Sequence, residues 1–406
     1  MERARRIAET VARESYGRLL AMLAARTRDI AAAEDALSDA MMAALRTWPE
    51  RGVPANPDAW LLTAARNALK NAARHLGVRT AAAPDILLLQ EQTPDDGALF
   101  PDERLKLLFV CAHPAIDPAV RTPLMLQTIL GLDAARIGSA FLVAPSTMGQ
   151  RLVRAKARIR ETGMRFEVPD PEDMPDRLCD VLSAIYAAYG TGWEGLDGAE
   201  ATVRDLTEEA VYLARLLVSL LPDEPEAKGL LALMLYCEAR RAARRDSSGQ
   251  FVPLDKQDAR LWSREMIIEA EALLTAAAGF RRFGRFQCEA AIQSVHVQRP
   301  ITGRTNHEAL ITLYQLLASR DPTTGVLVSF AAVLVAAARA DDALTMLETL
   351  PDADIRVYQP YWVVRARALH AVGERVQAAA ALQTAIGLTE QAPVRAFLRS
   401  LLDDPV

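Results

Sequence analysis

The sequence predicts an all-α protein of two or three domains. Alanine and leucine, which favour helices, are abundant, whereas aromatic residues make up only 6% of the 406 residues. Apolar residues recur at helical spacings of three and four, as Ile7, Val11, Leu19 and Leu23 do within an expected helix at 4–26. The chain is 51% hydrophobic and 24% charged, which excludes a wholly disordered protein. Several domains are expected because the chain is longer than a domain with a single hydrophobic core usually is.

Charge is distributed unevenly along the chain. The net charge is −5, but residues 1–169 hold 23 lysines and arginines against 19 acidic residues, while residues 170–406 hold 24 against 33. This asymmetry favours an N-terminal part that faces nucleic acid and a C-terminal part with a different task.

The first 77 residues are expected to hold three helices. The second covers about 31–47, and the three prolines between residues 49 and 57 require a loop after it, because proline lacks the backbone N–H that a helix uses. Asp58 is placed to cap a third helix at 59–75, which Gly77 ends. The next segment, up to residue 102, is rich in proline, alanine and aspartate and indicates a linker.

A second small unit follows this linker, and a longer helical part follows the second unit. In the longer part, Ala343 and Leu347 recur 35 residues later as Ala378 and Leu382, with Gly373 at the expected turn. This spacing is close to the 34-residue period of tetratricopeptide repeats. In the second unit, helices are expected near 103–113, 118–130, 133–141 and 146–161. The predicted division of the chain is 1–77, a linker at 78–102, 103–168 and 169–406.

Residues 133–160 have the pattern of a helix-turn-helix. Asp133 is expected to cap a first helix and Ser146 a second, which is crowded with basic residues. In such a motif the N-terminal residues of the second helix lie at base edges in the major groove. An ordinary helix with a solvated basic face is the alternative interpretation. We expect base contacts from Ser146, Thr147, Gln150 and Arg151, and phosphate contacts from Arg154, Lys156 and Arg158.

The helix expected at 59–75 carries a second set of polar side chains, with Trp60 as an apolar anchor. Asn56 lies near the tip of the loop before it, where an unstacked base can be held. A plain surface loop is the alternative interpretation. The polar side chains of this helix are Arg66, Asn67, Lys70 and Arg74.

The helix expected at 31–47 has a different character, because it contains no basic residue before Arg46. An acidic face on a module that otherwise faces DNA favours a basic protein partner. The acidic face consists of Glu34, Asp35 and Asp39, and the apolar stripe of Leu37, Met41 and Leu45.

Together these segments resemble a bacterial RNA polymerase sigma factor of the extracytoplasmic-function (ECF) group of the sigma-70 family. Residues 33–40 (AEDALSDA) are similar to the region 2 helix that docks on the polymerase clamp, and residues 57–67 (PDAWLLTAARN) to the stretch that reads and melts the −10 element. Residues 133–160 resemble region 4, which reads the −35 element. The resemblance implies that Glu34, Asp35 and Asp39 bind core RNA polymerase, and that −10 DNA is bound by Asn56, Trp60, Arg66, Asn67, Lys70 and Arg74.

The C-terminal part is similar to a long tetratricopeptide-like extension that one ECF subgroup carries after region 4. The similar segments are 220–227 (LLPDEPEA), 230–235 (LLALML) and 290–296 (AAIQSVH). The resemblance implies promoter recognition within a polymerase holoenzyme, with activity modulated by the extension. A regulatory protein or a ligand is expected as the partner of that extension.

No pattern in the sequence predicts catalysis. The histidines form no HxxxH or HExxH spacing, the four cysteines form no CxxC pair, and neither GxxxxGK[ST] nor GxGxxG occurs. We therefore expect no enzyme activity, no catalytic residue, no metal and no cofactor. With no uninterrupted apolar stretch of 18 residues and no secretory signal, a cytoplasmic protein without a membrane partner is expected.

Two functions of other classes remain open from the residues alone. One is a helical-repeat interaction protein whose N-terminal modules are degenerate. The other is a stand-alone helix-turn-helix regulator, which would bind duplex DNA without polymerase as a symmetric dimer.

Overall fold

The computed structural model confirms the all-α fold. It describes residues 2–77, 103–141, 143–170, 172–193, 200–389 and 391–403, of which 2–14, 73–77, 139–140, 191–193, 200–206 and 403 are described by their backbone only. Within these ranges no strand forms. The extended backbone pairing found there is limited to an isolated antiparallel bridge between Arg245 and Phe251. The expected linker at 78–102 lies outside the described residues.

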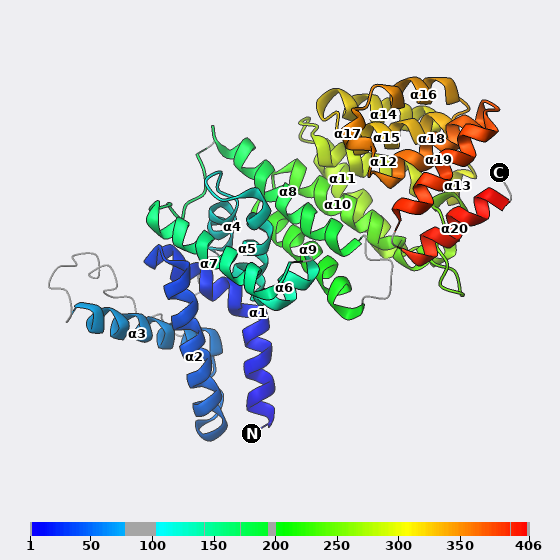
Figure 1. Ribbon diagram of the computed structural model, residues 1–406. Coiled ribbons are helices and arrows are strands. Elements are labelled where there is room, and N and C mark those ends of the chain that lie inside the picture. The colour runs from blue at the N-terminus through cyan, green and yellow to red at the C-terminus, as the bar shows by residue number, and fades with distance from the viewer. Residues whose placement is uncertain are drawn as a thin grey trace. The chain divides into compact units, whose positions relative to one another are not determined.

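The chain forms two compact units, Met1–Gly192 with Ala201–Ala210, and Trp193–Glu200 with Val211–Val406. The helices of the first unit (Figure 1) are α1 Glu2–Thr27, α2 Ile30–Arg51, α3 Pro57–Gly77, α4 Arg104–Cys111, α5 Pro118–Leu130, α6 Ala134–Ala140, α7 Pro145–Glu161 and α8 Met174–Trp193. Helix α9, Glu200–Leu220, begins in the first unit and ends in the second.

In the second unit, helices that are consecutive in the sequence pack against each other in pairs. Its helices are α10 Pro225–Ala239, α11 Arg264–Ala278, α12 Arg285–Val297, α13 Arg299–Thr302, α14 His307–Arg320, α15 Thr324–Ala336, α16 Ala340–Glu348, α17 Asp352–Ile355, α18 Gln359–Ala371, α19 Arg375–Leu388 and α20 Ala392–Asp403. Three short 3₁₀ turns, Arg241–Arg244, Leu254–Lys256 and Ala259–Leu261, lie in the segment between α10 and α11.

Local capping explains where the observed helices depart from the predicted ones. Helix α2 continues through Pro49 to Arg51, because a proline in the last turn removes only one hydrogen bond and the N–H of Gly52 still bonds to the carbonyl of Trp48. Helix α3 starts at Pro57 because the side chain of Asn56 accepts the N–H of Ala59 at 3.1 Å. The cap is therefore Asn56 and not Asp58.

The first unit depends on a close approach of α1 to α5 at Gly17. A Cβ atom at this position would lie 2.0 Å from the carbonyl oxygen of Ile129, which no side chain tolerates. One turn away, Gly131 ends α5 with a left-handed φ of 69° and lies against the ring of Tyr16. The two helices therefore meet backbone to backbone, and this contact joins the N-terminal three helices to α4–α7.

Helix α8 packs with the first unit, although the sequence places a domain boundary after residue 168. The buried hydroxyl of Thr122 on α5 donates to the carbonyl of Ala184 at 2.9 Å, and Arg121 forms an ion pair with Asp180 at 2.5 Å. These polar bonds add to the apolar burial of Leu178 and other α8 residues. The composition change near residue 169 marks a loop and not the end of the compact unit.

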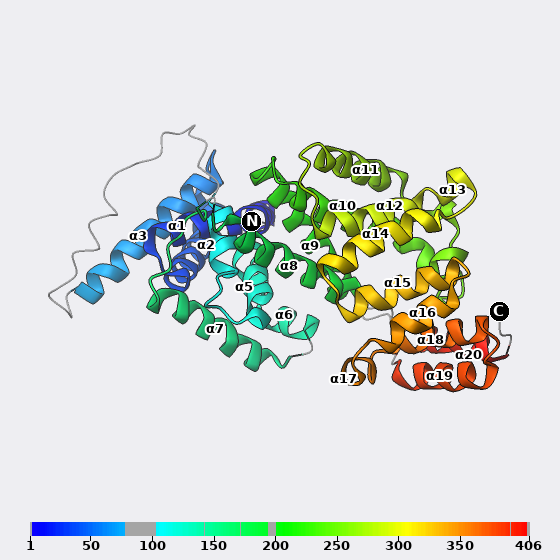
Figure 2. The ribbon, with the colours of Figure 1, turned by 90° about the horizontal axis from the view of Figure 1, so that it is seen from above.

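The two predicted repeat segments are the second helices of two helical hairpins, α15 with α16 and α18 with α19 (Figure 2). Ala343 and Leu347 on α16 are buried, and so are Ala378 and Leu382 on α19. The turn of each hairpin uses a left-handed residue, Ala338 in the first and Gly373 in the second, again 35 residues apart. The 35-residue spacing therefore corresponds to a repeated structural unit.

The contact at Gly17 leads to a prediction about stability. Alanine normally stabilises a helix by about 1 kcal/mol relative to glycine. At Gly17 we expect the opposite sign, a loss of about 2 kcal/mol for Gly17→Ala, because the added methyl group overpacks the α1–α5 contact. Urea denaturation followed by hydrogen exchange of α1 and α5 measures this change within the first unit.

Gly149→Ala is the matched control for this measurement. Its Cβ atom would make only an ordinary contact of 3.8 Å to Ala134, so the substitution should stabilise the same unit slightly. If Gly17→Ala stabilises the unit as much as Gly149→Ala, the α1–α5 contact does not limit the packing.

Candidate functional site

Helix α2 presents an exposed face that is both acidic and apolar. Asp35 and Asp39 are exposed on it, and they are joined by Ser38, Met42 and Leu45 at spacings of three and four. Met42 is 50% and Leu45 43% exposed, although both are large apolar residues. A face of this composition is suited to a protein partner that supplies both apolar contact and basic side chains.

Two residues of the predicted acidic and apolar sets on α2 turn inward instead. Leu37 is fully buried in the core, and the side chain of Glu34 is only 16% exposed. Met42 was missed at the sequence level because Leu37, Met41 and Leu45 already formed a regular stripe. Leu45 is exposed, as Asp35 and Asp39 are, whereas Leu37 of the same predicted stripe is buried.

Glu34 and Lys156 form a buried ion pair that joins α2 to α7. The Nζ of Lys156 donates to Oε2 of Glu34 at 2.5 Å, and the Lys156 side chain is 9% exposed. The same two helices carry a second pair at their rim, where Arg160 lies 3.6 Å from Asp29. The predicted phosphate contact of Lys156 and the predicted polymerase contact of Glu34 are replaced by a contact between the two residues in this structure.

Burial dominates the electrostatics around this pair. It raises the pKa of Glu34, an effect that Lys156 opposes and that Asp35 and Asp29 reinforce. Burial, followed by the charge of Glu34, raises the pKa of Tyr16. Oε1 of Glu34 has no hydrogen-bond partner among the described residues. Lys156 is therefore the cation that opposes the effect of burial on the pKa of Glu34.

Helix α3 presents the second predicted surface. Trp60 is half-buried, with its ring 5.5 Å from that of Trp48 in an edge-to-face arrangement, so it anchors the start of α3 against α2. The carboxylate of Asp58 forms an ion pair with Arg18 on α1. Asn56 is occupied as the helix cap, which fixes the loop but uses its side-chain oxygen.

The remaining polar side chains of α3 follow one side of the helix. Asn67 is exposed and Lys70 half-buried, while the side chain of Arg74 lies outside the described residues. Arg66 is half-buried, and burial, followed by the nearby charge of Arg26, lowers its pKa. Nε of Arg66 has no hydrogen-bond partner in the described part of the chain. Arg66 therefore carries a buried donor that no described residue satisfies.

Helices α6 and α7 cover the segment that the sequence predicts to be a helix-turn-helix. Asp133 caps α6 by accepting the N–H of Arg136 at 2.7 Å, as predicted. The turn is tight, because the N–H of Val143 bonds to the carbonyl of Gly138 and a Cβ atom at Gly138 would lie 2.6 Å from the carbonyl oxygen of Val143. Helix α7 starts at Pro145 with Ala144 before it, so Ser146 lies inside the first turn and is not the cap.

Most apolar residues of α7 lie on its buried side, although Val153 is 64% exposed. Met148, Leu152, Ala155 and Ile159 are buried against the unit. The side chains expected to face DNA, with the exception of Lys156, are exposed: Ser146, Thr147, Gln150, Arg151, Arg154 and Arg158. The exposed side of α7 is therefore a cationic surface with hydrogen-bonding residues at its N-terminal end, which is the composition that a DNA-reading helix requires.

The arrangement as a whole is suited to binding. In the described ranges, no group of three or more histidine, cysteine or acidic side chains is placed to hold a metal ion. No described helix is both long and apolar enough to cross a membrane. What the first unit offers is three polar surfaces, on α2, α3 and α7.

Comparison with known proteins links the α2 and α3 surfaces to a recognised segment. Residues 11–78, which cover most of α1–α3, match the family described as Sigma-70 region 2. Residues 177–278 match a family of unknown function, DUF6596. The chain is also 37% identical over 383 residues to the uncharacterized protein R00370 of Rhizobium meliloti (strain 1021), covering 93% of this chain and 90% of that protein. No solved structure matches the chain.

The buried pair predicts an asymmetric response to substitution. Lys156→Met leaves the carboxylate of Glu34 buried without a partner, and we expect it to destabilise the first unit by about 3 kcal/mol. Glu34→Gln combined with Lys156→Met removes both charges and should recover most of that loss. A double-mutant cycle in urea, with the two single variants and the double variant, measures the coupling.

The pH dependence gives an independent readout of the same pair. In Lys156→Met, burial without the cation raises the pKa of Glu34 further, so protonation favours the folded state. The stability deficit of this variant should therefore be full at neutral pH and shrink as the pH falls through the raised pKa. An equal deficit at all pH values would show that Glu34 is not the group left unpaired.

Proposed function

We propose that this chain, whose residues 11–78 match Sigma-70 region 2 and which belongs to one family with protein R00370, is an RNA polymerase sigma factor that directs promoter-specific initiation. Sigma-70 proteins are transcription factors, so the proposed activity consists of binding and not of covalent chemistry. The proposed partners are core RNA polymerase and promoter DNA, which places the action in the cytoplasm.

The exposed face of α2 is the single observation that carries the proposal. It lies within the region 2 match and combines Asp35 and Asp39 with the exposed apolar residues Met42 and Leu45. Packing within the fold does not explain two large apolar side chains at about half exposure beside two carboxylates that have no ion-pair partner among the described residues. A docking surface for polymerase explains both, because its partner buries the apolar residues and neutralises the acids.

The DNA contacts are proposed on the two other surfaces. We assign −35 recognition to the exposed residues of α7, with Ser146, Thr147, Gln150 and Arg151 at base edges and Arg154 and Arg158 at phosphates. We assign −10 contacts to α3, where Arg66, Asn67 and Lys70 have polar groups at the surface or without a partner. Lys156 joins the −35 surface only in a state in which it has left Glu34.

The finer classification is also part of the proposal. The segments quoted above resemble the ECF group, and the hairpins α15–α16 and α18–α19 repeat at 35 residues, close to the tetratricopeptide period. We propose that this tetratricopeptide-like extension modulates the activity of the N-terminal regions. The proposal is tested by run-off transcription from a cognate promoter with the full-length protein and core polymerase, where absence of specific transcripts would contradict it.

Asp39→Ala is expected to weaken binding to core polymerase about five- to tenfold, because an exposed carboxylate is lost from the centre of the α2 face. Its preference among promoter sequences should not change. Fluorescence anisotropy with labelled protein and core polymerase measures the affinity. Glu172→Ala, which removes an exposed carboxylate outside α2, is the matched control and should leave the affinity unchanged. Equal effects of the two substitutions would move the docking surface away from α2.

Arg151→Ala is expected to relax discrimination at one position of the −35 element by about 1–3 kcal/mol, because its guanidinium reads a base edge. Arg165→Ala removes an exposed arginine beyond the end of α7 and should at most weaken binding uniformly. Competition between promoters with different −35 elements in run-off transcription measures the discrimination of both substituted proteins. If Arg151→Ala weakens binding to all −35 variants equally, Arg151 would be reassigned to a phosphate contact.

A further inference from the structure

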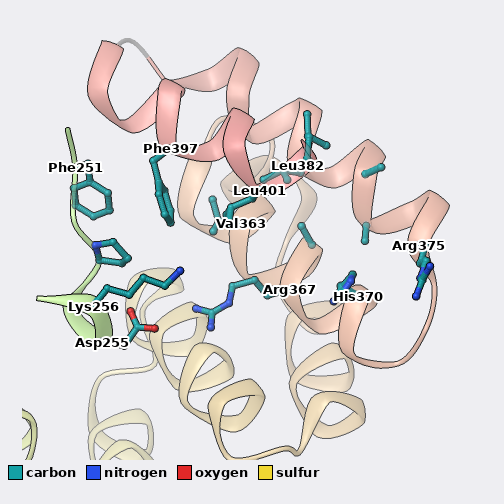
Figure 3. Close-up of a pocket in the computed structure, with 15 residues that line it drawn as sticks. Phe251, Asp255, Lys256, Val363, Arg367, His370, Arg375, Leu382, Phe397 and Leu401 are labelled. Atoms are coloured by element: carbon teal, nitrogen blue, oxygen red, sulfur yellow. The ribbon is translucent and has the colours of Figure 1, made fainter. Parts of the chain in front are cut away.

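The C-terminal end of the second unit contains a pocket that none of the proposed contacts uses. It lies between α18, α19 and α20 and the segment 251–256, and its volume is about 360 Å³ (Figure 3). This volume lies within the range of small-molecule sites in proteins. All the elements that line it belong to one compact unit, so the pocket is defined within that unit.

One side of the pocket is an apolar wall. The ring of Phe251 lies 5.6 Å from the ring of Phe397 in an edge-to-face arrangement, which attaches the 251–256 segment to α20 and closes this end of the pocket. The wall between α18, α19 and α20 consists of Val363, Leu382, Phe397, Leu401 and Leu402.

The other side of the pocket carries an excess of positive charge. Lys256, Arg367 and Arg375 line it, and Asp255 is the acidic residue among the lining residues. The described residues provide no ion-pair partner within 4 Å for any of the three cations. In Figure 3 the ammonium group of Lys256 and the guanidinium group of Arg367 point toward each other beneath Phe397, while Arg375 lies at the far end beside His370.

The segment that carries Lys256 is held in place by bonds that leave the pocket cations free. Arg299 donates to the backbone carbonyl oxygens of Asp255 and of Gln257, the latter at 3.0 Å, and its guanidinium lies over the ring of Trp262. Arg299 binds the backbone and leaves the side chains of Asp255 and Lys256, which line the pocket, without a bond to it. The backbone of this segment is thus held without a ligand, which lowers the entropic cost of binding one.

We propose that this pocket binds a small amphipathic carboxylate, with its head group between Lys256 and Arg367 and its apolar body along Val363, Leu382 and Leu401. A cationic ligand would be repelled by the excess positive charge. A neutral apolar ligand would cover two cations without pairing them, which is unfavourable. A compact anion without an apolar body would leave the wall in contact with water. The proposal does not rest on the function proposed above.

The size of the ligand follows from the volume of the pocket. At about 30 Å³ for each non-hydrogen atom, the share of a molecule in liquid water, a volume of about 360 Å³ holds about twelve atoms. Decanoate has this size and supplies one carboxylate and one unbranched apolar chain. It is therefore the probe for the test, and the physiological ligand is expected to share this chemistry.

The test compares decanoate with 1-decanol and decyltrimethylammonium by isothermal titration calorimetry on the full-length protein, below the concentrations at which they form micelles. We expect decanoate to bind at least about tenfold more tightly than 1-decanol, because two charge-assisted hydrogen bonds are added. The cationic analogue should not bind. Added salt should weaken the binding of decanoate more than the binding of 1-decanol, because the pocket cations are exposed to solvent.

Substitutions locate the site. Lys256→Gln and Arg367→Gln should each lower the affinity for decanoate about tenfold and leave the affinity for 1-decanol unchanged. Lys256 is exposed on a connecting segment, so its substitution does not threaten the fold even if Arg367→Gln does. Arg399→Gln removes an exposed arginine of α20 that does not line the pocket, and it is the matched control.

Three outcomes would overturn the proposal. The first is no binding of decanoate up to millimolar concentration. The second is equal affinity for decanoate and 1-decanol, which would show an apolar pocket without an anion site. The third is decanoate binding that Lys256→Gln does not change, which would place the carboxylate elsewhere.

Discussion

The missing side chain at Gly17 is the constraint on which the first unit depends. It lets α1 approach the carbonyl of Ile129 on α5 more closely than any residue with a Cβ atom would permit. Because α2 and α3 pack on α1, and α4 and α7 pack on α5, this approach brings α2 against α7. The buried pair of Glu34 and Lys156 is a consequence of that geometry, since the described residues give neither of them another ion-pair partner.

The helices of this protein were largely predictable because their signals are local. Helix α5 runs from Pro118 to Leu130 as predicted, since an aspartate cap and a left-handed glycine fix its two ends. The errors occur where two local signals compete. Asn56 lies directly before α3 and Asp58 in its first turn, and the choice between them depended on Arg18, which is distant in sequence and binds Asp58.

The candidate surfaces were predictable to the extent that helical periodicity decides exposure. It distinguished the buried Met148 and Leu152 from the exposed Gln150 and Arg151. It did not distinguish Lys156 from Arg154, because a basic residue at the edge of an apolar stripe is buried only if another helix supplies a carboxylate there. That carboxylate is 122 residues away, and no local pattern in α7 indicates it. The pocket near α20 was likewise invisible, because its cations come from separate segments.

The attachment of α8 to α5 affects how the protein can be divided for experiments. Thr122 and Arg121 both bond to α8, and Arg177 of α8 donates to the carbonyl of Phe109 on α4 at 2.6 Å. A recombinant fragment that stops at residue 168 would expose these groups together with the apolar strip beneath them. Such a fragment would tend to aggregate, and a loss of transcription by it would report misfolding and not regulation. Domain dissection of this protein therefore needs to keep α8 with the rest of the first unit.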